Sequence, residues 1–357
     1  MKYDISVIPG DGVGPECVNG ACTVLRAVEK RFAHTFNFHE YLAGGAAIDK
    51  FGVALPDETV KGVRNTDSLL LGAVGGPRWD KCETQRPEQA LLGLRAELNV
   101  FANLRHVVLF NALKCACPLK DNIIEDGINI MIVRELTGGI YFGKSGKSAD
   151  GSSAFDTEEY SVFEIERILN KAINVAKTRN KKITLVDKAN VMESSRLWRR
   201  VAEKIFAQHK DIQIEYMYVD NAAMQLVRNP KQFDTIVTSN LFGDILSDEA
   251  SQLAGSIGMV PSASLGEGGF GMYEPVHGSA PDIAGMNKVN PIATILSAAM
   301  MLRYSFNLDY EASAIDDAVT AMLDKTKFRT PDIATKESNI IGTDEMSRMI
   351  AQYVECC

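Results

Sequence analysis

Three aspartates near the middle of the chain have the spacing of a cation site. Asp244 and Asp248 stand four residues apart in a segment predicted to be helical, and Asp220 follows the preceding predicted strand. Positions i and i+4 share one helix face, so two carboxylates there repel each other unless a cation lies between them. Carboxylate oxygens suit Mg²⁺ or Mn²⁺, which leave positions for water or substrate. The alternative is a solvated acidic helix face.

Basic residues upstream could bind an anionic ligand. Arg95, Arg105 and Arg134 follow one another closely, and Arg134 ends an apolar predicted strand, where an unpaired cation would be costly. A guanidinium fork binds carboxylates in a bidentate manner. The three arginines therefore predict a small ligand with several carboxylates, although a surface salt bridge remains the alternative for each one alone.

A predicted helix that begins at Pro87 combines an apolar and a cationic side chain. Glu88, Leu91 and Arg95 stand at positions i, i+3 and i+7, and therefore share one face. This face would suit a ligand with a carboxylate and an apolar branch. Alternatively, the leucines belong to the core and the arginine is solvated.

Two further residues could transfer protons. Lys188 follows a predicted strand, and Tyr141 lies between glycines that allow close approach of the backbone. Lysine acts as a base only when burial or a nearby cation lowers its pKa from about 10.4 toward neutrality. A bound divalent ion would be such a cation, and tyrosine could serve as a proton donor beside it.

Alternating strands and helices must position these residues. We predict strands over residues 3–8, 68–72, 128–134, 183–186, 214–219 and 235–238, and helices over 17–32, 194–206, from Asp220 to 227 and around Asp244. Such alternation implies crossover connections in a largely parallel sheet, whose ligands bind beyond the carboxyl ends of the strands. We therefore expect Lys188, Asp220 and Asp244 at one edge of the sheet.

The glycine-rich segment 9–16 follows the first predicted strand. The third glycine of a dinucleotide-binding G-x-G-x-x-G motif would fall on Pro15, and no acidic residue closes a second strand at the required distance. We interpret it as a tight strand-to-helix turn at the edge of a cleft.

Composition limits the class of protein. The chain has 357 residues, which favours two domains, and its 46% hydrophobic and 24% charged residues are typical of a soluble globular protein. The formal net charge of −8 disfavours nucleic acid and anionic membranes as partners. The first residues lack the apolar core of a signal peptide, and the apolar run 291–302 is too short to span a bilayer, so we predict a buried helix there.

The seven cysteines are an odd number without a zinc-site pattern. Cys115 and Cys117 form one close pair, and Cys356 and Cys357 form another. We expect reduced thiols in a cytoplasmic protein.

Several long motifs resemble the isocitrate/isopropylmalate dehydrogenase family of β-decarboxylating enzymes. They are Gly75–Asp80 (GGPRWD), Arg86–Glu88 (RPE), Phe101–Arg105 (FANLR), Arg134–Gly143 (RELTGGIYFG) and Glu274–Gly285 (EPVHGSAPDIAG). The resemblance covers almost the whole chain and is weakest over 109–129, in a polar segment at about 144–160, and after Tyr310.

The resemblance implies a two-domain α/β fold with a large mixed, partly parallel sheet, distinct from the Rossmann fold. Residues 1–100 and 255–357 would form the first domain, with the nucleotide-binding loops and both termini. Residues 101–254 would form the second, with the metal and substrate residues, the dimer interface and an arm at about 144–160. The implied homodimer shares its active sites, so Lys188 and Asp220 would serve the neighbouring subunit.

The activity implied by the resemblance is oxidation of the 2-hydroxyl of (2R,3S)-3-isopropylmalate by NAD⁺, followed by decarboxylation and protonation to 4-methyl-2-oxopentanoate, a step of leucine biosynthesis. Lys188 would be the base and Tyr141 the acid. The implied substrate contacts are Arg95, Arg105, Arg134, Asp220, Leu91 and Glu88, and the implied ligands of Mg²⁺ or Mn²⁺ are Asp220, Asp244 and Asp248.

The resemblance also places the nucleotide on two segments. Its implied contacts are Gly75, Gly76, Glu88, His277, Gly278, Ser279, Ala280, Pro281, Asp282, Ile283 and Asn290. Asp282 would accept hydrogen bonds from the adenosine ribose, and its carboxylate would repel a 2′-phosphate, which favours NAD over NADP. The alternative for Asp282 is a turn residue after Pro281.

The chain departs from the family at His106, where proline usually follows the arginine. The sequence therefore does not predict the backbone conformation next to Arg105. Two other functions remain as alternatives. One is a sibling enzyme that acts on another 3-substituted malate, such as homoisocitrate or tartrate, although Leu91 and Leu92 favour an aliphatic branch. The other is a non-catalytic regulatory paralogue, which would be expected to lack part of the arginine, lysine and aspartate set.

Overall fold

The computed structural model describes residues 1–79 and 85–356 and divides into two compact units. Unit 1 comprises Met1–Val100, Leu109–Pro118 and Ala254–Cys357, and unit 2 comprises Phe101–Val108 and Leu119–Leu253. The predictions for Asp80 and Cys357 lie outside the described residues. The expected α/β fold with a large mixed, partly parallel sheet is confirmed.

Unit 1 has five strands of the sheet, in the order β2-β1-β3-β12-β11. Neighbouring strands run parallel except for the antiparallel pair β11–β12. The strands are β1 (Lys2–Gly10), β2 (Thr35–Glu40), β3 (Ser68–Ala73), β11 (Pro261–Leu265) and β12 (Gly271–Pro275), with a separate short pair β13 (Phe328–Arg329) and β14 (Asn339–Ile340).

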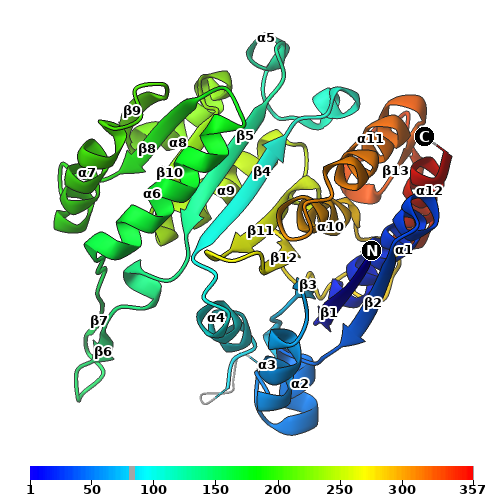
Figure 1. The fold of residues 1–357 in the computed structure, drawn as a ribbon, viewed down its shortest axis with the longest axis horizontal. Coiled ribbons are helices and arrows are strands. Elements are labelled where there is room, and N and C mark those ends of the chain that lie inside the picture. Colours follow the sequence, from blue (N-terminus) through cyan, green and yellow to red (C-terminus); the bar gives the residue numbers. More distant parts are fainter. Residues whose placement is uncertain (80–84, 357) are drawn as a thin grey trace. The chain divides into compact units, whose positions relative to one another are not determined.

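The helices of unit 1 surround these strands. They are α1 (Gly14–Phe32), α2 (Gly45–Phe51), α3 (Asp57–Arg64), α4 (Glu88–Glu97), α10 (Ile292–Tyr304), α11 (Asp309–Lys325) and α12 (Thr343–Cys356). Helix α1 packs beside α12, and α10 lies against β11 and β12 (Figure 1). Residues 292–302 of α10 are all buried, which confirms the predicted buried helix. Pro15 lies in the first turn of α1, where its missing N–H costs nothing.

Unit 2 has the strand order β4-β5-β10-β8-β9. The β4–β5 pair is antiparallel, and the other pairs are parallel. The strands are β4 (Ala102–Val108), β5 (Asn129–Glu135), β8 (Lys182–Asp187), β9 (Gln213–Tyr218) and β10 (Thr235–Thr238), and the helices are α5 (Asp121–Ile124), α6 (Val162–Lys177), α7 (Glu193–Phe206), α8 (Val219–Arg228) and α9 (Asn240–Leu253).

Two features of unit 2 refine the sequence predictions. Strand β4 continues through His106, whose ring bonds the Asn129 side chain at 2.9 Å, so Arg105 sits inside a regular strand. The polar segment forms a hairpin of β6 (Ser145–Lys147) and β7 (Ala154–Asp156) with mostly exposed residues.

No helix in the described part of the chain is long and apolar enough to cross a bilayer.

Candidate active site

Two buried arginines of unit 2 lie beneath the carboxylates of α9. Arg134, at the end of β5, donates to Asp244 Oδ1 at 2.5 Å and to Asn240 Oδ1 from Nε and Nη2 at 3.1 and 2.8 Å. Its side chain is only 3% exposed, whereas that of Asp244 is 35% exposed. A Cβ at position 243 would lie 2.6 Å from Arg134 Cγ, so only glycine lets α9 approach this closely. The expected cost of a lone buried cation is therefore avoided by pairing.

Arg105 reaches the same helix from the neighbouring strand β4. It donates to Ser247 Oγ at 2.6 Å and to Asp248 Oδ1 at 3.2 Å, and its Nη2 lies 3.4 Å from Asp244 Oδ1. The Asp248 side chain is 58% exposed. The paired carboxylates thus have guanidinium groups on one side and solvent on the other, which leaves oxygen atoms available to a ligand.

Tyr141 joins this group through its hydroxyl, which donates to Asp244 Oδ2 at 3.0 Å. Burial, followed by the negative charge of Asp244, raises the pKa of the Tyr141 phenol above its usual value. The phenol is therefore protonated at neutral pH. This places a proton donor next to the carboxylates, as a general acid requires.

The donor set fits a hard divalent cation. Asp244 and Asp248 supply carboxylate oxygens from one helix face, and Mg²⁺ and Mn²⁺ prefer such ligands. Within residues 1–79 and 85–356, no three His, Cys, Asp or Glu side chains gather as a metal site. A complete site would therefore need oxygen ligands beyond this pair, from a substrate, from water or from a second chain.

Lys188 and Asp220 form a separate pair in unit 2. The Lys188 ammonium donates to Asp220 Oδ1 at 2.6 Å and lowers the pKa of this carboxyl group. Lys188 directly follows β8, as predicted. Strand β9 ends at Tyr218 and α8 begins at Val219, so Asp220 also lies just past a strand end, in the first turn of the predicted helix.

The backbone before Lys188 is fixed by a buried ion pair. The Asp187 carboxylate accepts from Arg199 Nε and Nη2 at 2.6 and 3.0 Å, and also from the backbone N–H of Ala189 at 2.9 Å. The backbone N–H of Lys188 itself donates to Ser195 Oγ at 3.0 Å, so the peptides on both sides of Lys188 are held by side chains. Sequence reasoning missed Asp187 and Arg199.

In unit 1, the helix α4 carries the third predicted arginine. Arg95 is buried and donates to Glu274 Oε1 at 3.0 Å, while its Nε has no hydrogen-bond partner among the described residues. Leu91 is partly buried against a core cluster of this unit. The predicted contacts of Arg95 and Leu91 with substrate stay predictions.

The segment of Gly75 and Gly76, two of the implied nucleotide contacts, follows β3 and is held by Asp11, a residue that the sequence did not single out. Asp11 is buried and accepts backbone hydrogen bonds from Gly75 at 2.9 Å and from Gly45 and Ala46 at 2.8 Å each. The φ angle of Gly75 is +112°, a conformation that other residues rarely adopt. The carboxylate of Glu88 also lies close to Gly75. A Cβ at position 75 would be 2.8 Å from Glu88 Oε1.

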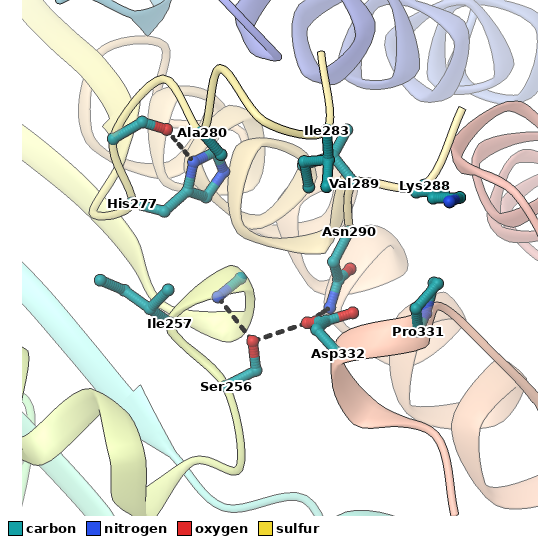
Figure 2. Close-up of a pocket in the computed structure, with 12 residues that line it drawn as sticks. Ser256, Ile257, His277, Ala280, Ile283, Lys288, Val289, Asn290, Pro331 and Asp332 are labelled. Atoms are coloured by element: carbon teal, nitrogen blue, oxygen red, sulfur yellow. Dashed lines mark hydrogen bonds between the residues drawn. The ribbon is translucent and has the colours of Figure 1, made fainter. Parts of the chain in front are cut away.

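A cavity of about 560 Å³ in unit 1 matches the predicted nucleotide loop (Figure 2). Its lining includes five predicted contacts: His277, Gly278, Ala280, Ile283 and Asn290. Ser279, Pro281 and Asp282 belong to the same loop, and Asp282 is exposed. Burial lowers the pKa of His277, so its ring is neutral at physiological pH. A largely apolar cavity with a few polar groups and a neutral ring fits an adenine nucleotide.

Several residues that line this cavity were not predicted from the sequence. Asp332 accepts from Ser256 Oγ at 2.6 Å and from Asn290 Nδ2 at 3.0 Å, and thereby joins three separate chain segments at one side of the cavity (Figure 2). Asp332 lies in the C-terminal region, where the motifs are weakest. The only signal in the sequence was the Pro-Asp pair that begins a turn.

This fold, with carboxylates of α9 paired to guanidinium groups of β4 and β5, is that of a dehydrogenase of the non-Rossmann α/β class. The chain belongs to the isocitrate/isopropylmalate dehydrogenase family, whose model matches residues 4–350.

Similar proteins agree on this family. The 3-isopropylmalate dehydrogenase of Geobacillus kaustophilus is 57% identical over 99% of this chain and 96% of the relative. The enzyme of the same name from Clostridium acetobutylicum is 54% identical over 98% of both chains. Among solved structures, isocitrate dehydrogenase from Methylococcus capsulatus aligns with a TM-score of 0.89 and 32% identity over 99% of both chains.

Proposed function

We propose that the protein oxidises (2R,3S)-3-isopropylmalate with NAD⁺ and decarboxylates the product to 4-methyl-2-oxopentanoate, in leucine biosynthesis. The proposal is supported above all by one cluster of side chains, which combines groups for carboxylate binding, cation binding and proton donation. Its members are Arg105, Arg134, Tyr141, Asp244 and Asp248. The relatives that share about half of all residues with this chain bear the name of this activity.

The two other functions find less support. A regulatory paralogue would not need to keep a buried guanidinium under two carboxylates and a protonated tyrosine beside them. A substrate with a third carboxylate, such as homoisocitrate, would require a polar side chain on α4 to bind that carboxylate. This chain has Leu91 and Leu92 there. The aliphatic branch of isopropylmalate suits these leucines.

The proposed cofactors are NAD⁺ and Mg²⁺ or Mn²⁺. When bound, NAD⁺ accepts the hydride from C2 of the substrate, and the divalent cation polarises the C2 oxygen. Asp244 and Asp248 of one chain, with Asp220 of a second copy of this chain, would hold the cation. The cavity around His277 and Asn290 would hold the adenosine part of NAD⁺, with the exposed Asp282 at the ribose.

The residues of the chain have separate roles in substrate binding and in proton transfer. Arg105 and Arg134, with Arg95, bind the substrate carboxylates and fix the orientation of C2 and C3. Lys188 accepts the proton of the 2-hydroxyl as the hydride leaves C2. The bond between C3 and its carboxylate then breaks, CO₂ leaves, and the electron pair of that bond forms an enolate. Tyr141 donates a proton to C3, which restores the ketone.

We further propose a cytoplasmic homodimer with shared sites. Exposed apolar side chains lie on α8 and α9, where Met224 is 60%, Val227 47% and Ile245 56% exposed. Exposed apolar side chains on neighbouring helices favour contact with another protein surface, here a second copy of this chain. A second chain that covers α8 and α9 would bring its own Lys188 and Asp220 near this cluster, because Asp220 lies in the first turn of α8 and Asp244 lies on α9.

A substrate panel tests the proposed activity. Purified protein with Mg²⁺ and NAD⁺ is expected to form NADH from isopropylmalate with a kcat/KM at least about a hundredfold above that for isocitrate, homoisocitrate, tartrate or malate. A binding site built for an apolar branch leaves the third carboxylate of isocitrate or homoisocitrate unpaired, and tartrate and malate lack the apolar branch. Absorbance at the NADH band gives the rates. A comparable rate with isocitrate or homoisocitrate would reject the substrate assignment.

A further inference from the structure

The glycine-rich turn 9–16 has no role in the proposed mechanism, yet it lies directly against the nucleotide loop of unit 1. The backbone N–H of Val13 donates to the carbonyl of Ser279 at 2.8 Å. A Cβ at Gly12 would lie 2.0 Å from the same carbonyl oxygen, so the approach of the two segments depends on glycine. The turn and the loop are therefore built to fit each other.

Glu16, in the first turn of α1, fastens the far end of the loop. Its Oε2 accepts from the backbone N–H of Gly285 at 2.7 Å, and its Oε1 accepts from that of Asn287 at 2.9 Å. Both loop residues have positive φ angles, of 73° and 55°. A carboxylate that receives two backbone hydrogen bonds offsets the cost of such conformations.

The residues held in this way adjoin the cavity. Lys288, Val289 and Asn290 follow immediately and line it. Beneath the loop, Val13 and Cys17 of the turn and helix form a small buried cluster with Val289. Glu16 thus acts on the cavity wall through the loop backbone, while its own side chain is absent from the lining.

We propose that Glu16 is a positioning residue for the cofactor, which it serves by holding residues 285–290 in the conformation that receives the adenosine part of NAD⁺. This inference rests on the proposed function for the identity of the ligand. A preformed loop avoids the cost of ordering the loop during binding, so loss of Glu16 weakens cofactor affinity rather than the chemical step.

The test compares Glu16→Ala and Glu16→Gln with Glu29→Gln. Glu29 lies on the same helix and also accepts a backbone N–H, that of Phe36, but it lies in an ion pair with Arg26 away from the loop. Fluorescence titration of each full-length variant with NADH gives Kd. We expect Kd to rise about tenfold in Glu16→Ala and by less in Glu16→Gln, which keeps one acceptor oxygen.

Two further readouts separate positioning from general loosening. At saturating NAD⁺, kcat for isopropylmalate should stay within about twofold of the wild-type value in both Glu16 variants. Glu29→Gln should lower Tm without a change in Kd for NADH. An unchanged Kd in Glu16→Ala, or an equal rise of Kd in Glu29→Gln, would overturn the inference.

The test of Glu16 can be distinguished from the test of the proposed activity, because the first measures affinity for NADH and the second measures oxidation of isopropylmalate. If the wild-type protein binds NADH but does not oxidise isopropylmalate, the substrate assignment fails, and the Kd values of the variants still decide the role of Glu16.

Discussion

Replacement of Lys188 by methionine is expected to lower kcat for NADH formation from isopropylmalate by about a thousandfold, because the 2-hydroxyl then loses its proton acceptor. Methionine is unbranched and only one atom shorter than lysine, but it carries no titratable group. The Lys188 amine pairs with the carboxylate of Asp220, which is 62% exposed, so removal of the amine leaves this charge in contact with solvent. The loss should therefore appear in activity rather than in stability.

The matched control for this variant is Lys182→Met. Lys182 lies at the start of the same strand, β8, and forms a comparable ion pair with Glu215 at 2.9 Å. It should keep kcat within about twofold of the wild-type value, since surface ion pairs contribute little. If Lys188→Met retained more than about a tenth of the wild-type kcat, Lys188 would not be the base.

The second large effect is expected for Asp248→Asn. This change removes one carboxylate charge from α9 while it keeps the shape and an acceptor oxygen for Arg105, which lies 3.2 Å away. We expect the Mg²⁺ concentration for half-maximal activity to rise, and kcat to fall, by about a hundredfold or more, since even the outer partners of metal ligands are worth about 10- to 100-fold.

Glu249→Gln provides the comparison on the neighbouring position. Glu249 carries the same charge on α9 but lies outside the Asp244 and Asp248 face. Its Mg²⁺ response should match that of the wild-type protein. An Asp248→Asn protein with an unchanged Mg²⁺ response would contradict the assignment of this aspartate as a metal ligand.

Much of this architecture follows from local patterns. The strands and helices between residues 182 and 253 were predicted to within a few residues, because buried β-strands and amphipathic helices have distinct periods. The i, i+4 spacing of Asp244 and Asp248 correctly placed both on one helix. Asp220 was predicted just past the strand 214–219, and it lies there, in the first turn of α8 directly after β9.

The supporting residues could not be predicted in the same way. Asp11, Glu16 and Glu274 bond partners that lie 64, 269 and 179 positions away in the chain, respectively. Such pairs depend on the tertiary fold, and a single sequence carries no periodic signal for them. For the same reason, the pairing of Arg134 with Asp244 emerged only when β5 and α9 were placed side by side.

We propose that each active site draws its residues from two chains, and mixed dimers test this arrangement. Separately purified Lys188→Met and Asp248→Asn proteins are unfolded, mixed in equal amounts and refolded together. If Lys188 serves the neighbouring subunit, each mixed dimer contains one intact site, and the mixture should regain about a quarter of the wild-type activity. Activity that stays at the level of the two single variants, although mixed dimers have formed, would contradict the shared site.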